Sequence, residues 1–199
     1  MGVFMSVIDR FEEWCRSKGG KAERDKYVKS VSCKFPDYLG DEEVREFMRF
    51  VDANRRDLRK EDYDVCVEYE EKLIGGYREG EEVCYFPSDD RIHVGAKYYS
   101  DYGVSGELMG GLPKSFTERK TVDAHRITFG KEMDVEWNDA TDEWMGLGNV
   151  GASIGYRVAK KNPDIVVKML DKAKEDAAYY ANEALDYIKP AEEEEEEYL

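Results

Sequence analysis

The chain has 199 residues, of which 45 are acidic and 30 basic, and its formal charge of −15 falls only to −9 when the six glutamates Glu192–Glu197 are removed. A surface of this charge repels phosphate backbones and anionic membranes, which argues against specific nucleic-acid or membrane binding. With 41% hydrophobic and 13% aromatic residues, the composition excludes a disordered chain and predicts one soluble, packed domain.

Two helices are predicted in the first third of the chain. Val7 to Ser17 carries apolar residues at helical spacing, with Ser6 as the capping residue and Gly19-Gly20 at its end. The following segment, Lys21–Lys34, fits either a short helix or a strand. Asp41 is predicted to cap a second helix, which buries an apolar stripe. Cations near its C-terminal end complement the helix macrodipole, namely Arg55, Arg56 and Arg59.

From Tyr63 the hydrophobic period changes to two, which predicts half-buried strands. The segments with this pattern are Tyr63–Glu70, Glu82–Phe86, Ile92–Tyr99, Ala124–Phe129 and Met133–Trp137. Their short spacing favours an antiparallel meander over βαβ units. Gly103–Pro113 is predicted to be a long loop, and Asn138–Gly155 is glycine-rich and predicted to be irregular.

The last element is a helix from Asp164 to Ile188, which Pro190 is expected to stop. Its seam is rich in alanine and allows a neighbouring element to approach closely. The predicted fold class is α+β, an antiparallel sheet of about four to five strands flanked by two N-terminal helices and one long C-terminal helix. Residues 1–189 form the domain, and 190–199 an acidic, disordered tail.

The four cysteines, Cys15, Cys33, Cys66 and Cys84, form no C-x-x-C pair and match no zinc-site spacing. They are interpreted as reduced, buried thiols of a cytosolic-type protein. No secretory signal peptide is recognised at the start of the chain. The predicted location is therefore cytoplasmic, or the virion if the protein is viral.

One motif, Gly146-Leu-Gly148-Asn-Val-Gly151, matches the G-x-G-x-x-G pattern of dinucleotide-binding folds. The pattern requires a hydrophobic strand directly before it, but the preceding residues, Asn138–Trp144, are polar and acidic. These glycines are therefore expected in a turn or an interface loop, and no cofactor is predicted.

His93 and His125 are the two histidines, and both lie in strand-like segments. Asp89 and Asp90, close to His93, form a candidate cation site, but paired loop carboxylates are more often simply solvated. Neither catalytic nor metal-ligating residues are assigned.

The run Ile92-His-Val94-Gly95-Ala96-Lys-Tyr98-Tyr99-Ser-Asp101-Tyr102-Gly103 resembles the strand and loop "V-G-x-x-Y-x-x-Y-x-x-G" of tail-completion or neck proteins of tailed viruses. The resemblance implies a small α+β fold that assembles into a ring between capsid and tail. The residue before the final glycine, usually acidic in that family, is Tyr102 here.

Three functions remain open. The first is a non-enzymatic assembly protein, most concretely a virion neck or tail component forming a ring with like subunits and contacting neighbouring assembly proteins. The second is an acidic adaptor or inhibitor that binds a basic partner as a DNA mimic. The third is a small metal-dependent enzyme using loop carboxylates near His93. Candidate interface residues are aromatic or large and apolar, namely Tyr98, Tyr99, Tyr102, Leu108, Met109, Trp144, Met145, Tyr179 and Tyr180.

Overall fold

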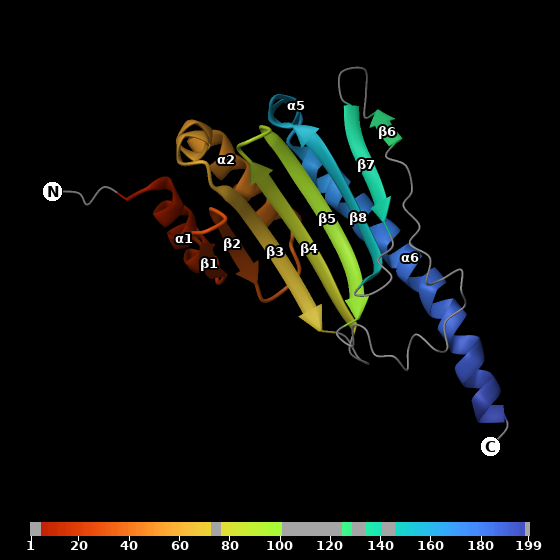
Figure 1. Ribbon diagram of the computed structural model, residues 1–199. Helices are drawn as coiled ribbons and strands as arrows, with labels where there is room; N and C mark the ends of the chain where they lie inside the picture. The colour runs from red at the N-terminus through yellow and green to blue at the C-terminus, as the bar shows by residue number, and fades with distance from the viewer. Residues whose placement is uncertain (1–4, 73–76, 101–124, 129–133, 141–145, 198–199) are drawn as a thin grey trace.

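The computed structural model describes residues 5–72, 77–100, 125–128, 134–140 and 146–197. Helices and strands alternate in the first part of the chain, and strands dominate the middle (Figure 1). The first six elements are α1 (Val7–Ser17), β1 (Lys21–Asp25), β2 (Ser30–Phe35), α2 (Asp41–Glu61), β3 (Asp64–Lys72) and β4 (Tyr77–Phe86). The remaining six are β5 (Arg91–Ser100), β6 (His125–Thr128), β7 (Asp134–Ala140), β8 (Gly146–Gly155), α5 (Tyr156–Lys161) and α6 (Asp164–Glu197).

The strands form one eight-stranded sheet in the order β1-β2-β3-β4-β5-β8-β7-β6. Every neighbouring pair is antiparallel except β2 and β3, which run parallel. Parallel neighbours need a crossover connection, and α2 supplies it. The α+β class is therefore confirmed. The prediction of a four- to five-stranded antiparallel sheet was wrong in strand number and in this parallel pair.

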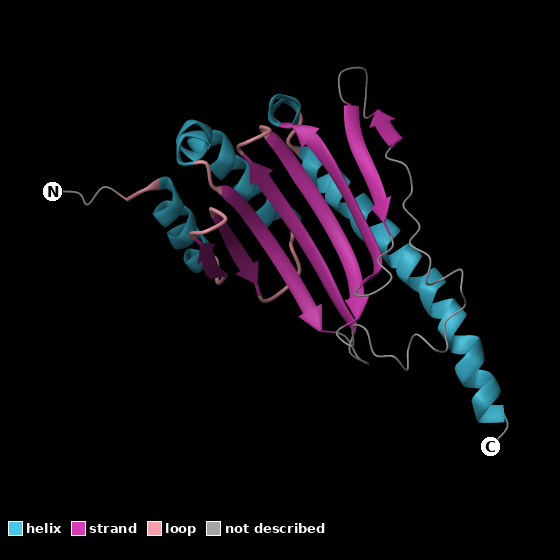
Figure 2. Cartoon of the chain, viewed as in Figure 1, coloured by secondary structure: helices cyan, strands magenta, loops and turns pink. Residues whose placement is uncertain are grey.

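All the long helices lie on one face of the sheet (Figure 2). Helix α1 packs on β1 and β2, α2 on β3, and α6 on β4, β5 and β8. Strand residues alternate accordingly: in β3, Val65 and Val67 are buried under the helices, whereas Cys66 and Glu68 point to the other face. We call the face without helices the open face.

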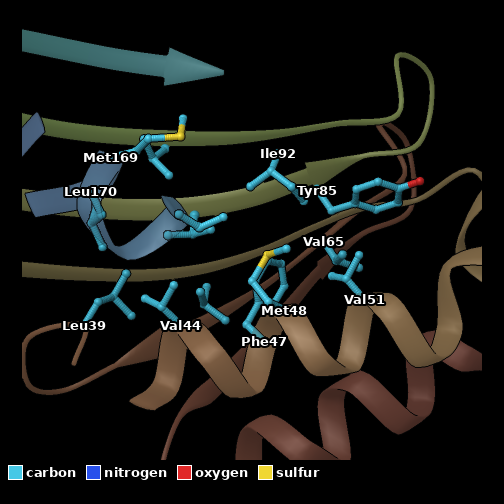
Figure 3. Close-up of a cluster of buried hydrophobic side chains, with 14 of the residues drawn as sticks. Leu39, Val44, Phe47, Met48, Val51, Val65, Tyr85, Ile92, Met169 and Leu170 are labelled. Atoms are coloured by element: carbon cyan, nitrogen blue, oxygen red, sulfur yellow. The ribbon is translucent and has the colours of Figure 1, made fainter. Parts of the chain in front are cut away.

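The core fills the space between the sheet and the helices. Aliphatic and aromatic side chains from α2, β3–β5 and α6 meet there (Figure 3). Phe11 of α1 extends this core, since its ring centroid lies 6.2 Å from that of Phe47. The start of α1 is fixed by a capping box, in which the Ser6 hydroxyl accepts from the Asp9 N–H and the Asp9 carboxylate accepts from the Ser6 N–H.

Helix α6 lies very close to β8. A Cβ atom placed on Gly148 would come within 3.0 Å of the Ala177 carbonyl oxygen and of the Tyr180 Cβ. Ala173, Ala177 and Ala181 are all buried. The alanine seam therefore serves close packing within the chain, on β5 and β8.

The last helix is also longer than its sequence predicts. α6 includes Pro190 and the six glutamates and ends at Glu197. A proline inside a helix removes one backbone hydrogen bond but does not prevent helical residues on both sides, and glutamate is a good helix former. The expected end at Ile188 was therefore wrong.

Among the helices within the described ranges, none combines the length and the apolar character needed to cross a membrane.

All four cysteines are paired, which corrects their interpretation as reduced thiols. Cys15 of α1 is bonded to Cys33 of β2, and Cys66 of β3 to Cys84 of β4. The first pair ties a helix to the sheet, and the second links adjacent strands on the open face. Gly20 packs against the first pair, since a Cβ there would lie 2.5 Å from the Cys33 sulfur.

Replacing Ala177 by leucine should destabilise the fold by about 2 kcal/mol, because added carbons cannot be accommodated at the close contact between α6 and β8. Urea unfolding measures the change. The matched control is Ala178→Leu, at the next position but exposed, where a change within about 0.5 kcal/mol is expected. Equal effects at both positions would contradict the close packing.

The double substitution Cys15→Ala, Cys33→Ala should lower the free energy of unfolding by about 3 kcal/mol, because the disulfide closes a loop of 18 residues in the unfolded chain. Urea unfolding of the oxidised proteins measures it. Unreduced wild-type protein in denaturant should show no reactive thiol with a thiol reagent. Detection of free thiols there would argue against the pairs.

Candidate functional site

The open face carries a strip without formal charge across the middle of the sheet. Register partners on five consecutive strands, from β2 through β8, form this strip, which we call the neutral strip: Ser32, Cys66, Cys84, His93 and Ser153. In a chain with 38% charged residues, five neighbouring uncharged positions on an uncovered face are unexpected. The strip ends beside acidic residues on both sides, at Glu23 of β1 and Glu136 of β7.

Next to the neutral strip the open face is hollowed by about 460 Å³. The floor is formed by Gly95 and Gly151, which are register partners on β5 and β8 and have no side chains to fill the space. Carboxylates, amides and one aromatic ring surround this floor, from Glu82, Phe86, Glu136, Asn138 and Asn149. The hollow is therefore open and of mixed polarity, and it suits a protruding side chain of a partner better than an enclosed small molecule.

Charged side chains flank the strip and pair along the sheet. Lys34 lies 3.0 Å from Glu23 and 3.5 Å from Glu68. The hydrogen bond to Glu23 raises the pKa of Lys34, whereas burial raises the pKa of Glu68. On the other side, Arg91 donates hydrogen bonds to the Ser153 hydroxyl. These contacts stabilise the sheet, and the Arg91 guanidinium lies directly against Ser153 at one end of the strip.

The candidate cation site is not assembled. The His93 Nε2 lies 3.3 Å from the Asp89 carboxylate, and its ring is 4.5 Å from that of Phe86 on the open face. Asp90 is turned toward α2, where Arg55 donates two hydrogen bonds to it. Within the described ranges no three His, Cys, Asp or Glu side chains come together as possible metal ligands.

Asp90 is the centre of a polar network at one end of the sheet. Its carboxylate accepts the Tyr85 hydroxyl at 2.7 Å as well as the Arg55 guanidinium, which lies 4.4 Å over the Tyr156 ring. Its carbonyl accepts the Tyr156 N–H, and the Tyr156 hydroxyl donates to Asp52 of α2. The network therefore joins α2, the β4–β5 turn and α5.

The contacts of the network shift the pKa values of its members. The hydrogen bond from Arg55 lowers the pKa of Asp90, and the hydrogen bond from Tyr156 lowers that of Asp52. Burial, followed by the neighbouring carboxylates, raises the pKa of Tyr85 and Tyr156. Each acid is thus kept ionised and each phenol neutral, which suits structural pairing rather than proton transfer at neutral pH.

The structure places the predicted interface residues at separate positions. Tyr98 and Tyr99 belong to β5, far along the strand from the neutral strip, and Tyr179 and Tyr180 stack edge to face on α6 with Tyr179 exposed. Tyr180 packs against the core. The others lie outside the described residues: Tyr102, Leu108, Met109, Trp144 and Met145.

The glycines of the G-x-G-x-x-G motif all lie in β8, so the expectation of a turn or interface loop was wrong. The strand–turn–helix geometry that holds a pyrophosphate is absent from this described segment. Gly148 admits α6, and Gly151 forms the floor of the hollow.

Sequence reasoning missed the neutral strip because its members come from five strands and β8 was not recognised.

The sequence did contain one signal for the second disulfide. Cys66 and Cys84 each stand nine residues from Gly75, in the glycine pair that separates two strand-like segments. A hairpin centred there places them opposite each other, as the register confirms.

Replacing Asp90 by asparagine should lower the free energy of unfolding by about 2 kcal/mol at neutral pH, because Arg55 loses its charged acceptor. Asparagine tolerates the left-handed backbone at this position, where φ is 55°. The control is Asp89→Asn, which removes the neighbouring, exposed charge and should have little effect.

The effect should depend on pH. Because the pKa of Asp90 is lower in the folded state, its contribution is present above the unfolded-state value of about 4 and is lost as the pH falls through the lowered value. Urea unfolding at several pH values should therefore show the wild type and D90N converging in acid. A difference that is constant with pH would contradict the network.

Comparisons with protein-family models, with curated proteins and with solved structures find no match to this chain.

Proposed function

We propose that this chain is a non-enzymatic assembly protein that associates with like subunits through the open face of its sheet. The observation that carries the proposal is the neutral strip, an uncharged band on an uncovered face of a highly charged protein. The centres of protein interfaces are depleted in charge and their rims are polar. The neutral strip between Glu23 and Glu136 has the same arrangement.

The chemistry of the face supports this function over catalysis. Asp90 and Lys34, two groups near the sheet whose pKa values are shifted, are already paired with Arg55 and Glu23. The pKa of Asp64 is raised instead by burial and by the like charges of Asp62 and Asp89. Of the two loop carboxylates considered for an enzyme, Asp89 lies 3.3 Å from His93, but Asp90 is bound to α2. The hollow over Gly95 and Gly151 offers room for a side chain of a partner.

The most concrete form of the proposal is a virion neck or tail component that forms a ring. It rests on the resemblance of Ile92–Gly103 to tail-completion proteins, and residues 92–100 of that segment form the central strand β5. Disulfides persist on virion surfaces and are rare in the cytosol of most organisms. The two disulfides are therefore easier to reconcile with the virion than with the cytoplasm.

A second candidate is an acidic adaptor or inhibitor that binds a basic partner. The observation that favours it is the concentration of charge at the end of α6, where Glu192–Glu197 follow one another in a chain of formal charge −15. This function needs a monomer whose acidic helix is available, whereas the first needs a defined oligomer.

Size-exclusion chromatography with light scattering distinguishes the two. The wild type should form an oligomer of defined mass, and the double variant Ser32→Lys, His93→Lys should shift it to smaller species. The two lysines place charge in the neutral strip, and each has an acidic neighbour, Glu23 or Asp89, so folding should not suffer.

The control is Glu175→Lys on the exposed side of α6, which changes the formal charge by the same two units. It should leave the oligomer intact. A wild-type protein that stays monomeric at high concentration would contradict the assembly function and favour the adaptor. An oligomer that is unaffected by both variants would show that the open face is not the contact.

A further inference from the structure

Positive charge gathers on α5 and on the neighbouring part of α2 that follows its acidic first turn. Residues 45–61 of α2 and 157–161 of α5 hold nine cations and four acids, a local net charge of +5 against −15 for the whole chain. The two helices touch, since Lys160 lies 3.2 Å from Asp52 and Tyr156 donates to the same carboxylate.

Five of these cations are exposed and have no carboxylate within ion-pair distance in the described part of the chain. We call them the basic surface: Arg56, Arg59, Lys60, Arg157 and Lys161. The three on α2 are spaced i, i+3 and i+4, and the two on α5 are spaced i, i+4, so each set lies on one side of its helix. Arg56 is one turn from Asp52, where α5 is attached, and this connects the two sets.

The acidic end of the chain cannot reach its own basic surface. α6 begins directly after α5 and runs along the sheet, so that the C-terminus lies beyond the opposite end of the sheet from α5 (Figure 1). Glu192 comes 28 residues after Asp164, which separates the two by about 42 Å along a helix. A continuous helix cannot fold back, so only another molecule can bring such an acidic segment to the basic surface.

We propose that the basic surface binds the Glu192–Glu197 segment of a second copy of this chain. The contact joins unlike patches at opposite ends of the molecule, so it is head-to-tail, and repeating it generates a ring when the rotation closes. The inference rests on the proposed self-association and adds a second contact, between helices, to the one through the open face. Charge complementarity selects the occupant: six consecutive carboxylates meet five unpaired cations.

A nucleic acid is the other polyanion that a basic surface could bind. The chain disfavours it, because the remainder of the molecule carries a large negative charge that repels a phosphate backbone. Contacts between exposed charges are individually weak and screened by salt. Association through this contact should therefore weaken as salt is added.

The test uses two full-length charge-reversal variants. The surface variant carries Arg56→Glu, Arg157→Glu and Lys161→Glu, and the arm variant carries Glu192→Lys, Glu194→Lys and Glu196→Lys. Each alone should weaken self-association by at least about tenfold in sedimentation or light scattering at low salt. Mixed in equal amounts they should associate again, because each supplies the charge that the other lacks.

A matched control reverses three exposed cations elsewhere that form no ion pair within the described part of the chain: Arg16→Glu, Lys26→Glu and Lys168→Glu. It should associate as the wild type does.

If both variants still form the oligomer of the wild type, or if they fail to complement each other, this contact is overturned and the proposed assembly is left intact. A monomeric wild type would overturn the assembly itself. Binding of duplex DNA by the wild type, lost in the surface variant, would identify a nucleic acid as the occupant and overturn the inference.

Discussion

A polar network around Asp90 anchors the segment that leads into the C-terminal helix. The Asp90 carboxylate accepts hydrogen bonds from Arg55 and Tyr85, and the carbonyl of the same residue holds the first N–H of α5. α5 is thereby attached to α2 and to the β4–β5 turn at once. Because α6 follows α5 within a few residues, the same network sets where α6 starts across the sheet.

Because helices cover only one face of the sheet, the two faces of each strand meet different requirements. Helix α6 must lie flat on β5 and β8, and it can do so because Gly148 and Ala177 remove the side chains between the two backbones. The other face is left for side chains that no helix buries. Gly151, on that face of the same strand, leaves a hollow rather than a contact. One glycine-rich strand thus serves packing on one side and a candidate interface on the other.

The sequence predicts the elements whose patterns are local and fails where the pairing is not local. Val44, Phe47 and Val51 at helical spacing, and Val65 and Val67 at strand spacing, were sufficient to find α2 and β3. β8 was missed because glycine has low strand propensity, and its partners make it a strand. The parallel pairing of β2 with β3 and the Cys15–Cys33 disulfide depend on how α1 and α2 pack, which no single segment contains. The neutral strip could not be predicted for the same two reasons, the unrecognised strand β8 and the non-local pairing of β2 with β3. It forms only when the register of all five strands is fixed.

Charge and assembly are connected in the proposed ring. A head-to-tail contact between the basic surface and Glu192–Glu197 places the unpaired cations of each copy inside an interface. The contact also buries the six glutamates, so the exposed surface keeps nearly all of the net negative charge of the chain but loses these five cations. A polyanion that passes such a ring meets repulsion, because the cations that would release its counterions are already bound. The asymmetric distribution of charge in one subunit would thus both direct assembly and keep the assembled surface from adhering to DNA.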